Sequence, residues 1–151
     1  MRKELTVSEA QSRCEALCSR AEHSTGDIER KLWQWGIAKA DAERIIDHLV
    51  DERYIDNARY ASAYVRDKMR YNAWGRIKIS QGLRTVGVSD ADVRMALAEI
   101  DEEEYKAILR TVIDRKRRQL PDDDDEYTVR TKLIRHALSH GFEMDIVLDN
   151  V

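Results

Sequence analysis

The sequence predicts an all-α fold made of three tandem three-helix modules, and three observations support this class. Charged residues make up 36% of the 151 positions, and the helix-favouring residues Ala, Leu, Arg, Glu and Lys are abundant. Turn formers are scarce, with six Gly and one Pro. Apolar residues recur every three or four positions, as in amphipathic helices, and a short glycine pattern occurs three times.

The repeated pattern places an apolar residue four positions before a glycine, which a second apolar residue follows. Its copies lie about fifty residues apart. Because glycine reaches positive φ without strain, each copy is expected to form a sharp turn between two helices. We therefore place the modules at 1–54, 55–100 and 101–151; one irregular helical bundle is the alternative. The copies are Leu32-x-x-x-Gly36-Ile37, Leu83-x-x-x-Gly87-Val88 and Ala137-x-x-x-Gly141-Phe142.

Capping residues predict the helices of the first module. A capping box starting at Ser8 predicts a helix that begins near Glu9. Ser24, with Asp27 three positions later, predicts the start of a second helix, which ends at Gly36. A third helix follows and ends near Tyr54. The apolar stripes are Ala10, Cys14, Leu17, Cys18 and Ala21, then Ile28, Leu32 and Trp35, then Ala42, Ile45, Ile46 and Leu49.

The later modules are read in the same way. Asp56 is expected to cap one helix, Ser89 opens another, and Asp101 begins a longer one. The long helix ends on the basic run 115–118, where the helix dipole favours positive charge. An acidic linker near 121–126 follows. The expected inward residues are Ala61, Tyr64, Val65 and Met69, then Ile79, Gly82, Leu83 and Val86, then Val93, Ala96, Leu97 and Ile100, then Tyr105, Ile108, Leu109, Val112 and Ile113, and finally Val129, Leu133 and Ala137.

Two residue pairs have the spacing of metal ligands. Cys14 and Cys18 lie four positions apart, and His23 is near enough to complete a site. A structural zinc site normally needs four closely spaced ligands, so two reduced, half-buried core residues are the preferred interpretation. His136 and His140 also lie four apart, but no third ligand or general base stands beside them. A solvated or capping role is preferred, because His140 occupies the last turn of its helix.

No catalytic motif occurs in the chain, so no enzyme, cofactor or resident metal is expected. The phosphate-binding loop, the dinucleotide fingerprint and the common hydrolase and metalloprotease motifs are all missing. The run 122–125 has no central glycine, which a calcium loop needs. It is interpreted as a solvated linker that repels phosphate or pairs with the basic run 115–118.

Positive charge is concentrated in the middle of the chain. Six basic residues and one acidic residue lie between Arg66 and Arg84, although the formal net charge of the chain is -3. This separation predicts a surface for an acidic protein or for nucleic acid phosphate; an ordinary solvated face is the alternative. Trp74 is either a plug at the helix corner or an interface anchor. The predicted partner-binding residues are Arg59, Arg66, Lys68, Arg70, Trp74, Arg76, Lys78 and Arg84.

Several stretches resemble one known family. The segments YIDNARYA (54–61), Tyr64-Val65-Arg66 and WGRIKI (74–79), with the turn at 83–88, resemble the central part of the RecX family. Shorter flanking matches are Glu22-His23-Ser24, Lys31-Leu32, Gly36-Ile37 and the segment 137–142. The sequence departs from the family at Thr25-Gly26, where a basic residue often stands.

The resemblance implies a small bacterial regulator that binds RecA and its filament on DNA. Such a protein would lie along the filament as an elongated, curved array and inhibit ATP hydrolysis and strand exchange. It would thereby modulate recombination, DNA repair and the SOS response, with weak direct DNA contact. The array itself would be a monomer.

The residues themselves are also compatible with two other classes of protein. Short three-helix units with sharp turns resemble helix-turn-helix modules, so a free-standing DNA-binding regulator is one alternative. A purely structural adaptor is the other.

No apolar run approaches a membrane span, and Met1-Arg2-Lys3-Glu4 does not begin a signal peptide. We therefore expect a cytoplasmic protein.

Overall fold

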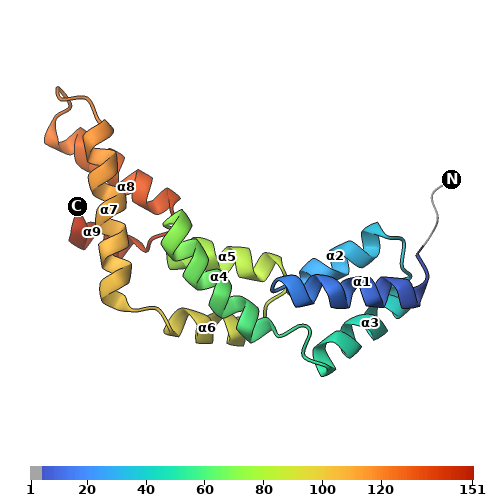
Figure 1. Ribbon diagram of the computed structural model, residues 1–151. Coiled ribbons are helices and arrows are strands. Elements are labelled where there is room, and N and C mark those ends of the chain that lie inside the picture. The colour runs from blue at the N-terminus through green and yellow to red at the C-terminus, as the bar shows by residue number, and fades with distance from the viewer. Residues whose placement is uncertain (1–4) are drawn as a thin grey trace. The chain divides into compact units, whose positions relative to one another are not determined.

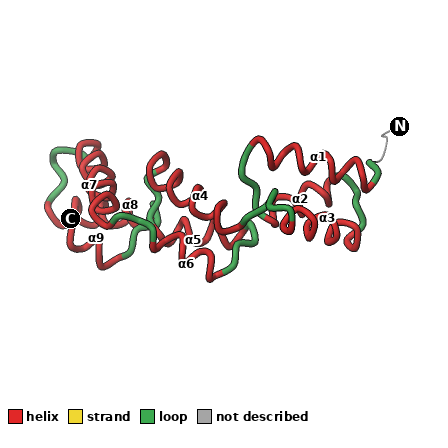
Figure 2. Tube along the Cα trace, turned by 60° about the horizontal axis from the view of Figure 1, so that its bottom comes forward, coloured by secondary structure: helices red, strands yellow, loops and turns green. Residues whose placement is uncertain are grey.

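The structure, a computed structural model, describes residues 5–151, and every regular element in that range is an α-helix (Figures 1 and 2). The predicted all-α class is confirmed. The segment Met1-Arg2-Lys3-Glu4, on which the signal-peptide expectation depends, lies outside the described residues. The helices are α1 (Val7–Arg20), α2 (Thr25–Gln34), α3 (Lys39–Asp51), α4 (Asn57–Asn72), α5 (Arg76–Thr85), α6 (Asp90–Ala98), α7 (Glu102–Gln119), α8 (Glu126–Ser139) and α9 (Met144–Asn150).

The chain forms two compact units. The first holds the residues up to Ala63 together with Leu83–Met95, and the second holds Tyr64–Gly82 together with Ala96–Val151. The division falls inside α4, α5 and α6, so each of these helices contributes to both units. The module boundaries at 1–54, 55–100 and 101–151 stay a prediction. No helix between residues 5 and 151 combines the length and apolar character needed to cross a membrane.

In the first unit, α3 packs against α1 and α2 (Figure 1). The predicted capping box at the start of α2 is confirmed: the Asp27 N–H donates to the Ser24 hydroxyl at 3.0 Å, and the Ser24 N–H donates to the Asp27 carboxylate at 3.3 Å. These helices enclose one apolar core. Its buried residues are Ala10, Cys14, Ile28, Leu32, Ile45, Ile46, Leu49 and Ile55.

The predicted start of the first helix was wrong by two residues. Helix α1 begins at Val7, and Thr6 is its N-cap, accepting the Glu9 N–H at 3.1 Å. Ser8 lies inside the first turn. Both Thr6 and Ser8 have a hydroxyl that can cap a helix, and the local sequence does not choose between them. The chain uses the earlier residue and adds half a turn.

Cys14 and Cys18 belong to the core, as preferred from the sequence. Cys14 is fully buried, Cys18 is half-buried against the same core, and neither forms a disulfide. Burial raises the pKa of the Cys14 thiol to about 11, so this thiol is protonated at neutral pH. Cys14 therefore acts as a small apolar residue.

The three glycine turns share one geometry, which confirms the repeat. The backbone φ angles are +77° at Gly36, +84° at Gly87 and +91° at Gly141. In each turn the residue after the glycine donates its N–H to the carbonyl five positions earlier. The distances are 3.0 Å for Ile37 to Leu32, 3.1 Å for Val88 to Leu83 and 3.4 Å for Phe142 to Ala137. This is the Schellman arrangement of a helix end.

In the second unit, α7, α8 and α9 pack against one another (Figure 1). The rings of Tyr105 and Phe142 are both fully buried, and their centroids lie 5.2 Å apart. Asp125 caps α8 by accepting the Thr128 N–H at 2.7 Å. The remaining buried residues of these three helices are Leu109, Val112, Ile113, Leu133, Ala137 and Val147.

The acidic run does not pair with the basic run 115–118, contrary to one of the expectations. Asp124 instead pairs with Lys132 at 2.6 Å, and Arg117 pairs with Asp114 at 3.8 Å. Both pairs are local, joining positions that lie eight and three residues apart in the chain. The linker is also shorter than predicted, because Glu126 already belongs to α8.

Two helix starts are docked on glycine turns. At the first, which we call the first junction, the Gly26 N–H in α2 donates to the Val86 carbonyl at 3.1 Å. The Thr25 N–H donates to the side-chain carbonyl of Asn57 at 3.1 Å. A Cβ on Gly26 would lie 2.2 Å from the Val86 oxygen, so only glycine allows this approach.

The second junction joins the start of α5 to the α8–α9 turn. The Gly75 N–H donates to the His140 carbonyl at 2.7 Å, and the Ile77 N–H donates to the Gly141 carbonyl at 3.0 Å. The Arg76 N–H donates to the Tyr105 hydroxyl at 3.0 Å. A Cβ on Gly75 would lie 2.3 Å from the carbonyl carbon of Gly141. Gly26 and Gly75 thus have the same role in separate units.

Candidate partner-binding surface

Three of the predicted site residues come together in the second unit. The Lys68 and Lys78 ammonium nitrogens lie 4.9 Å and 4.7 Å from the centroid of the Trp74 ring. Each such cation–π contact is worth about 0.5–1 kcal/mol at exposed sites. Among residues 5–151, no carboxylate forms an ion pair with either lysine. We call this group the lysine–tryptophan corner: two positive charges on one half-buried indole.

Local structure sets the position of Trp74. The chain leaves α4 through Ala73, which has a positive φ of +53°, and the Trp74 N–H donates to the Lys68 carbonyl at 3.1 Å. Such a backbone conformation is costly for alanine and needs support from its surroundings. His140 provides it, because its Nδ1–H donates to the Ala73 carbonyl at 2.9 Å. The corner therefore depends on the second junction.

Arg66 is exposed on α4 in the same unit as the lysine–tryptophan corner. Within the described part of the chain, none of the ion pairs or hydrogen bonds involves its guanidinium. A guanidinium without an intramolecular partner keeps all its N–H donors for a carboxylate or a phosphate. Arg66, Lys68 and Lys78 are thus the predicted cations that no carboxylate of residues 5–151 neutralises.

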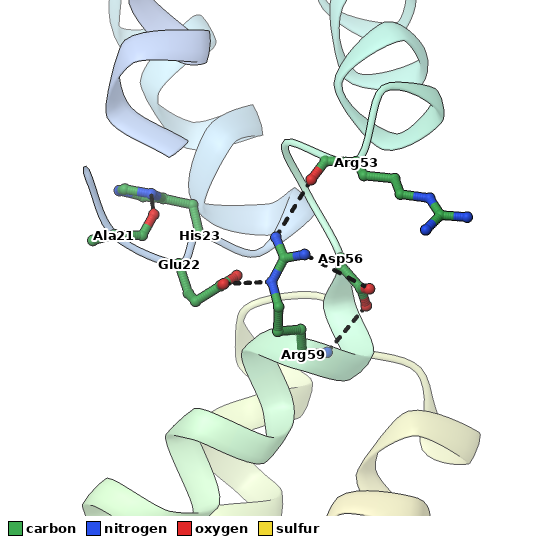
Figure 3. A network of polar contacts seen from close by, with 6 residues as sticks. All are labelled: Ala21, Glu22, His23, Arg53, Asp56 and Arg59. Carbon is green, nitrogen blue, oxygen red and sulfur yellow. Dashed lines mark hydrogen bonds and ion pairs between the residues drawn. The ribbon is translucent and has the colours of Figure 1, made fainter. Parts of the chain in front are cut away.

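Arg59 is held in a network within the first unit (Figure 3). Its guanidinium donates to the Glu22 carboxylate and to the Arg53 carbonyl at 3.4 Å, and lies 4.0 Å from the Asp56 carboxylate. Asp56 also accepts the Arg59 N–H at 3.0 Å, which confirms the predicted cap of α4. The hydrogen bond with Glu22 raises the pKa of Arg59, so this cation is stabilised by its own chain.

Arg70 and Arg84 also have acidic partners. Arg70 makes a two-pronged contact with Glu104, at 2.7 Å and 3.3 Å, and Arg84 contacts Asp90 at 3.0 Å. The hydrogen bond from Arg70 holds the pKa of Glu104 below its ordinary value. The exposed fractions of these four side chains range from 33% at Glu104 to 67% at Asp90, and pairs this accessible to solvent stabilise a fold little. They do lower the charge that each arginine presents to a partner.

Arg76 serves the fold rather than the surface. Its side chain is only 19% exposed, and its guanidinium contacts the Glu102 carboxylate and, at 2.8 Å, the Glu143 carboxylate. The same group lies 4.1 Å from the centroid of the Tyr105 ring. Burial raises the pKa of the Tyr105 phenol, and its hydrogen bond to Glu143 raises it further, so the phenol stays protonated. Arg76 therefore does not contribute to the exposed positive charge around Trp74.

The predicted set therefore separates into two groups. Arg66, Lys68, Trp74 and Lys78 are available, whereas the remaining arginines are paired. Sequence reasoning missed the partners because most of them are distant in the chain. Glu22 lies 37 positions from Arg59, and Glu143 lies 67 from Arg76. No local pattern marks a pair at that separation.

Helix pairs joined by recurrent glycine turns, with helix starts docked on two of these turns through close glycine contacts, define a class of all-helical repeat protein. Two family models match the chain. The model of the second three-helix domain of RecX matches residues 56–97, and that of the third matches residues 102–149. Together these matches span more than half of the 151 residues. The chain belongs to the RecX family.

Relatives and solved structures agree with this family. The chain is 29% identical over 146 residues to Regulatory protein RecX of Mycobacterium sp. (strain KMS), covering 95% of this chain and 80% of the relative. It is 31% identical over 125 residues to the protein of the same name from Clostridium botulinum (strain Eklund 17B / Type B), covering 82% and 58%. These relatives are named as regulatory proteins, not as enzymes.

The fold matches two crystal structures. RecX from Lactobacillus salivarius superposes with a TM-score of 0.83 at 22% identity, covering 95% of this chain and 92% of that one. A second structure of regulatory protein RecX gives a TM-score of 0.82 at 21% identity, covering 95% and 73%. At these identities the likeness shows the fold alone.

Proposed function

We propose that this protein binds RecA and the RecA filament on DNA and inhibits its ATP hydrolysis and strand exchange. The observation that carries the proposal is the set of cations left unneutralised in the second unit: Arg66 on α4 and the two lysines on the Trp74 ring. Membership of a family of regulatory proteins supports a regulatory role. Recombination and DNA repair would be the processes modulated, in the cytoplasm.

The proposed mechanism makes and breaks no covalent bond. Arg66 and the lysine–tryptophan corner contact carboxylates of RecA or the phosphates of its bound DNA, and Trp74 supplies an apolar anchor between the two ammonium groups. Binding one filament state more tightly than another shifts the population toward that state. A repeating helical chain suits a repeating target, because several weak contacts on one chain act together. A single copy of the chain suffices, without a cofactor.

A filament ATPase assay with a charge-matched control tests the proposal. The triple variant Arg66→Glu, Lys68→Glu, Lys78→Glu is compared with Arg94→Glu, Arg115→Glu, Arg135→Glu, which reverses three exposed arginines elsewhere on the chain. We expect the first variant to need about ten times more protein, or more, for half-inhibition of RecA on single-stranded DNA. The second variant should inhibit like the wild type. Circular dichroism confirms that both are folded.

Two outcomes contradict the proposal. If wild-type protein leaves the RecA ATPase unchanged, the proposed function is wrong. If both triple variants inhibit the ATPase equally, the assignment of the binding surface is wrong. Binding to duplex DNA without RecA, weakening steeply with salt, together with an unchanged RecA ATPase, would instead indicate a free-standing DNA-binding regulator.

A further inference from the structure

The two junctions use the same backbone groups. In each, the acceptor is the carbonyl of the residue directly before a turn glycine: Val86 before Gly87, and His140 before Gly141. In each, the donor is the N–H of a second glycine at the start of a helix, Gly26 or Gly75. The Schellman turns at Gly87 and Gly141 are therefore receptors for a helix start that carries glycine.

The third turn of this kind has no such occupant. A Cβ added to Gly36 would have no heavy atom within 4 Å, whereas one added to Gly141 would meet Lys78 at 2.4 Å. Trp35 stands where Val86 and His140 stand in the other turns. In the described part of the chain, no residue of another helix donates to its carbonyl. We call residues 33–37 the open turn.

The groups beside the open turn are typical of a protein contact surface. Trp33, in the last turn of α2, is 79% exposed, and its carbonyl accepts the Gly36 N–H at 3.0 Å. The C-terminal end of α2 carries the negative end of the helix dipole, which attracts the positive start of another helix. An exposed indole beside such a receptor supplies apolar area for an anchor.

A second copy of the chain does not supply a matching helix start. Gly26 and Gly75 are already used, and the start of α8 is the equivalent position in the third repeat. There the Asp125 carboxylate accepts the Thr128 N–H at 2.7 Å, and the first two helical residues are Glu126 and Tyr127 rather than glycine. Placing this acidic end, with its run 122–125, against the Trp35 carbonyl would bring negative charge to the negative end of α2. These charges disfavour the start of α8 of a second copy as the occupant.

We propose that the open turn binds the start of a helix of the partner protein, one whose first turn carries a glycine and unbonded N–H groups. The Trp35 carbonyl accepts an N–H of that helix, as Val86 and His140 do within this chain, and Trp33 packs beside it. This inference rests on the proposed function, because RecA is the partner expected to supply the helix. The contact is separate from the lysine–tryptophan corner, since it lies in the other unit.

Photo-cross-linking tests which partner occupies the open turn. The photoreactive residue p-benzoylphenylalanine replaces Trp33 in one protein and Tyr127, which is also 79% exposed, in a control. Each is irradiated with RecA filaments on single-stranded DNA and the products are mapped by mass spectrometry. We expect position 33 to cross-link to RecA in the first turn of a helix next to a glycine, and position 127 to give little product. Cross-links to DNA, to a second copy of the chain or to other parts of RecA overturn the inference.

A binding titration separates failure of this inference from failure of the proposed function. Trp33→Glu should weaken filament binding about tenfold or more with an unchanged melting temperature, whereas Tyr127→Glu should bind like the wild type. Wild-type protein that does not bind the filament overturns both. Wild-type protein that binds, with Trp33→Glu binding equally well, overturns only the docking of a helix at the open turn.

Discussion

At the first junction, one backbone hydrogen bond from Gly26 is supplemented by a reciprocal pair, in which Thr25 donates its N–H to Asn57 and Asn57 donates to the Thr25 hydroxyl at 3.3 Å. At the second junction, two backbone bonds are supplemented by the hydroxyl of Tyr105, which is fully buried. The Thr25 and Asn57 residues, by contrast, are only half-buried. The two junctions thus share the same backbone contact, but different side chains add hydrogen bonds to it in the two units.

The difference shows how burial sets the cost of losing a bond. A polar group left without a partner costs more where water does not replace the missing partner. Water can reach the Asn57 pair when one member is removed, but not the buried Tyr105 hydroxyl. We therefore expect perturbations of the second junction to cost more than the matching perturbations of the first.

The largest effect is expected from alanine at the junction glycines. Gly75→Ala forces a Cβ to within 2.3 Å of the α8–α9 turn and should lower the free energy of unfolding by about 2–4 kcal/mol. Gly26→Ala makes a similar clash with Val86, but it also adds a helix-favouring residue to α2, worth up to about 1 kcal/mol. It should cost less. Urea unfolding followed by circular dichroism measures both, and a larger loss for Gly26→Ala would contradict the comparison.

Removing the Tyr105 hydroxyl is the next largest perturbation. Tyr105→Phe leaves the Arg76 N–H without its acceptor and removes one of the two donors to the Glu143 carboxylate, which keeps its contact with the Arg76 guanidinium. The expected cost is about 1–3 kcal/mol. Amide hydrogen exchange should show faster exchange at Arg76. The control is Tyr127→Phe, which removes the hydroxyl of an exposed tyrosine. If Arg76 exchanges equally slowly in both variants, the hydroxyl does not hold the second junction.

Asn57→Ala makes the equivalent change at the first junction. It removes the acceptor of the Thr25 N–H, and because water replaces part of the loss, the expected cost is about 0.5–1.5 kcal/mol. Thermal unfolding of Asn57→Ala and Tyr105→Phe under the same conditions compares the two losses of stability directly. A cost equal to or above that of Tyr105→Phe would mean that burial does not distinguish the junctions.

The smallest effect is a pH dependence confined to the second unit. Burial lowers the pKa of His136 below its ordinary value of 6.5, and nearby His140 and Lys116 lower it further. Between the lowered pKa and 6.5 the unfolded chain binds more protons than the folded one, so stability rises with pH across that window and falls on acidification. His136→Gln should flatten this part of the stability–pH profile measured by urea unfolding. An unchanged slope would show that His136 is not its source.

The helices and turns were predictable because their signals are local. The Ser24 capping box and the cap at Asp56 depend on contacts within three residues, and the turns at Gly36, Gly87 and Gly141 need only a glycine beside an apolar pair. The misplaced start of α1, at Thr6 instead of Ser8, arose where two local signals competed. The concentration of cations around Trp74 was also visible, because those residues lie close together in the chain.

Tertiary structure decided which of these cations remain available and what two of the glycines do. Glu22 and Glu104 reach Arg59 and Arg70 only because the fold brings segments that are distant in the chain together, so composition alone overstated the charge on the surface. Gly26 is required by the close approach of the Val86 carbonyl, which no local pattern predicts. Local backbone preferences depend on neighbouring residues and can be predicted from the sequence. How closely two backbone segments approach depends on the positions of both segments, which only the tertiary structure gives.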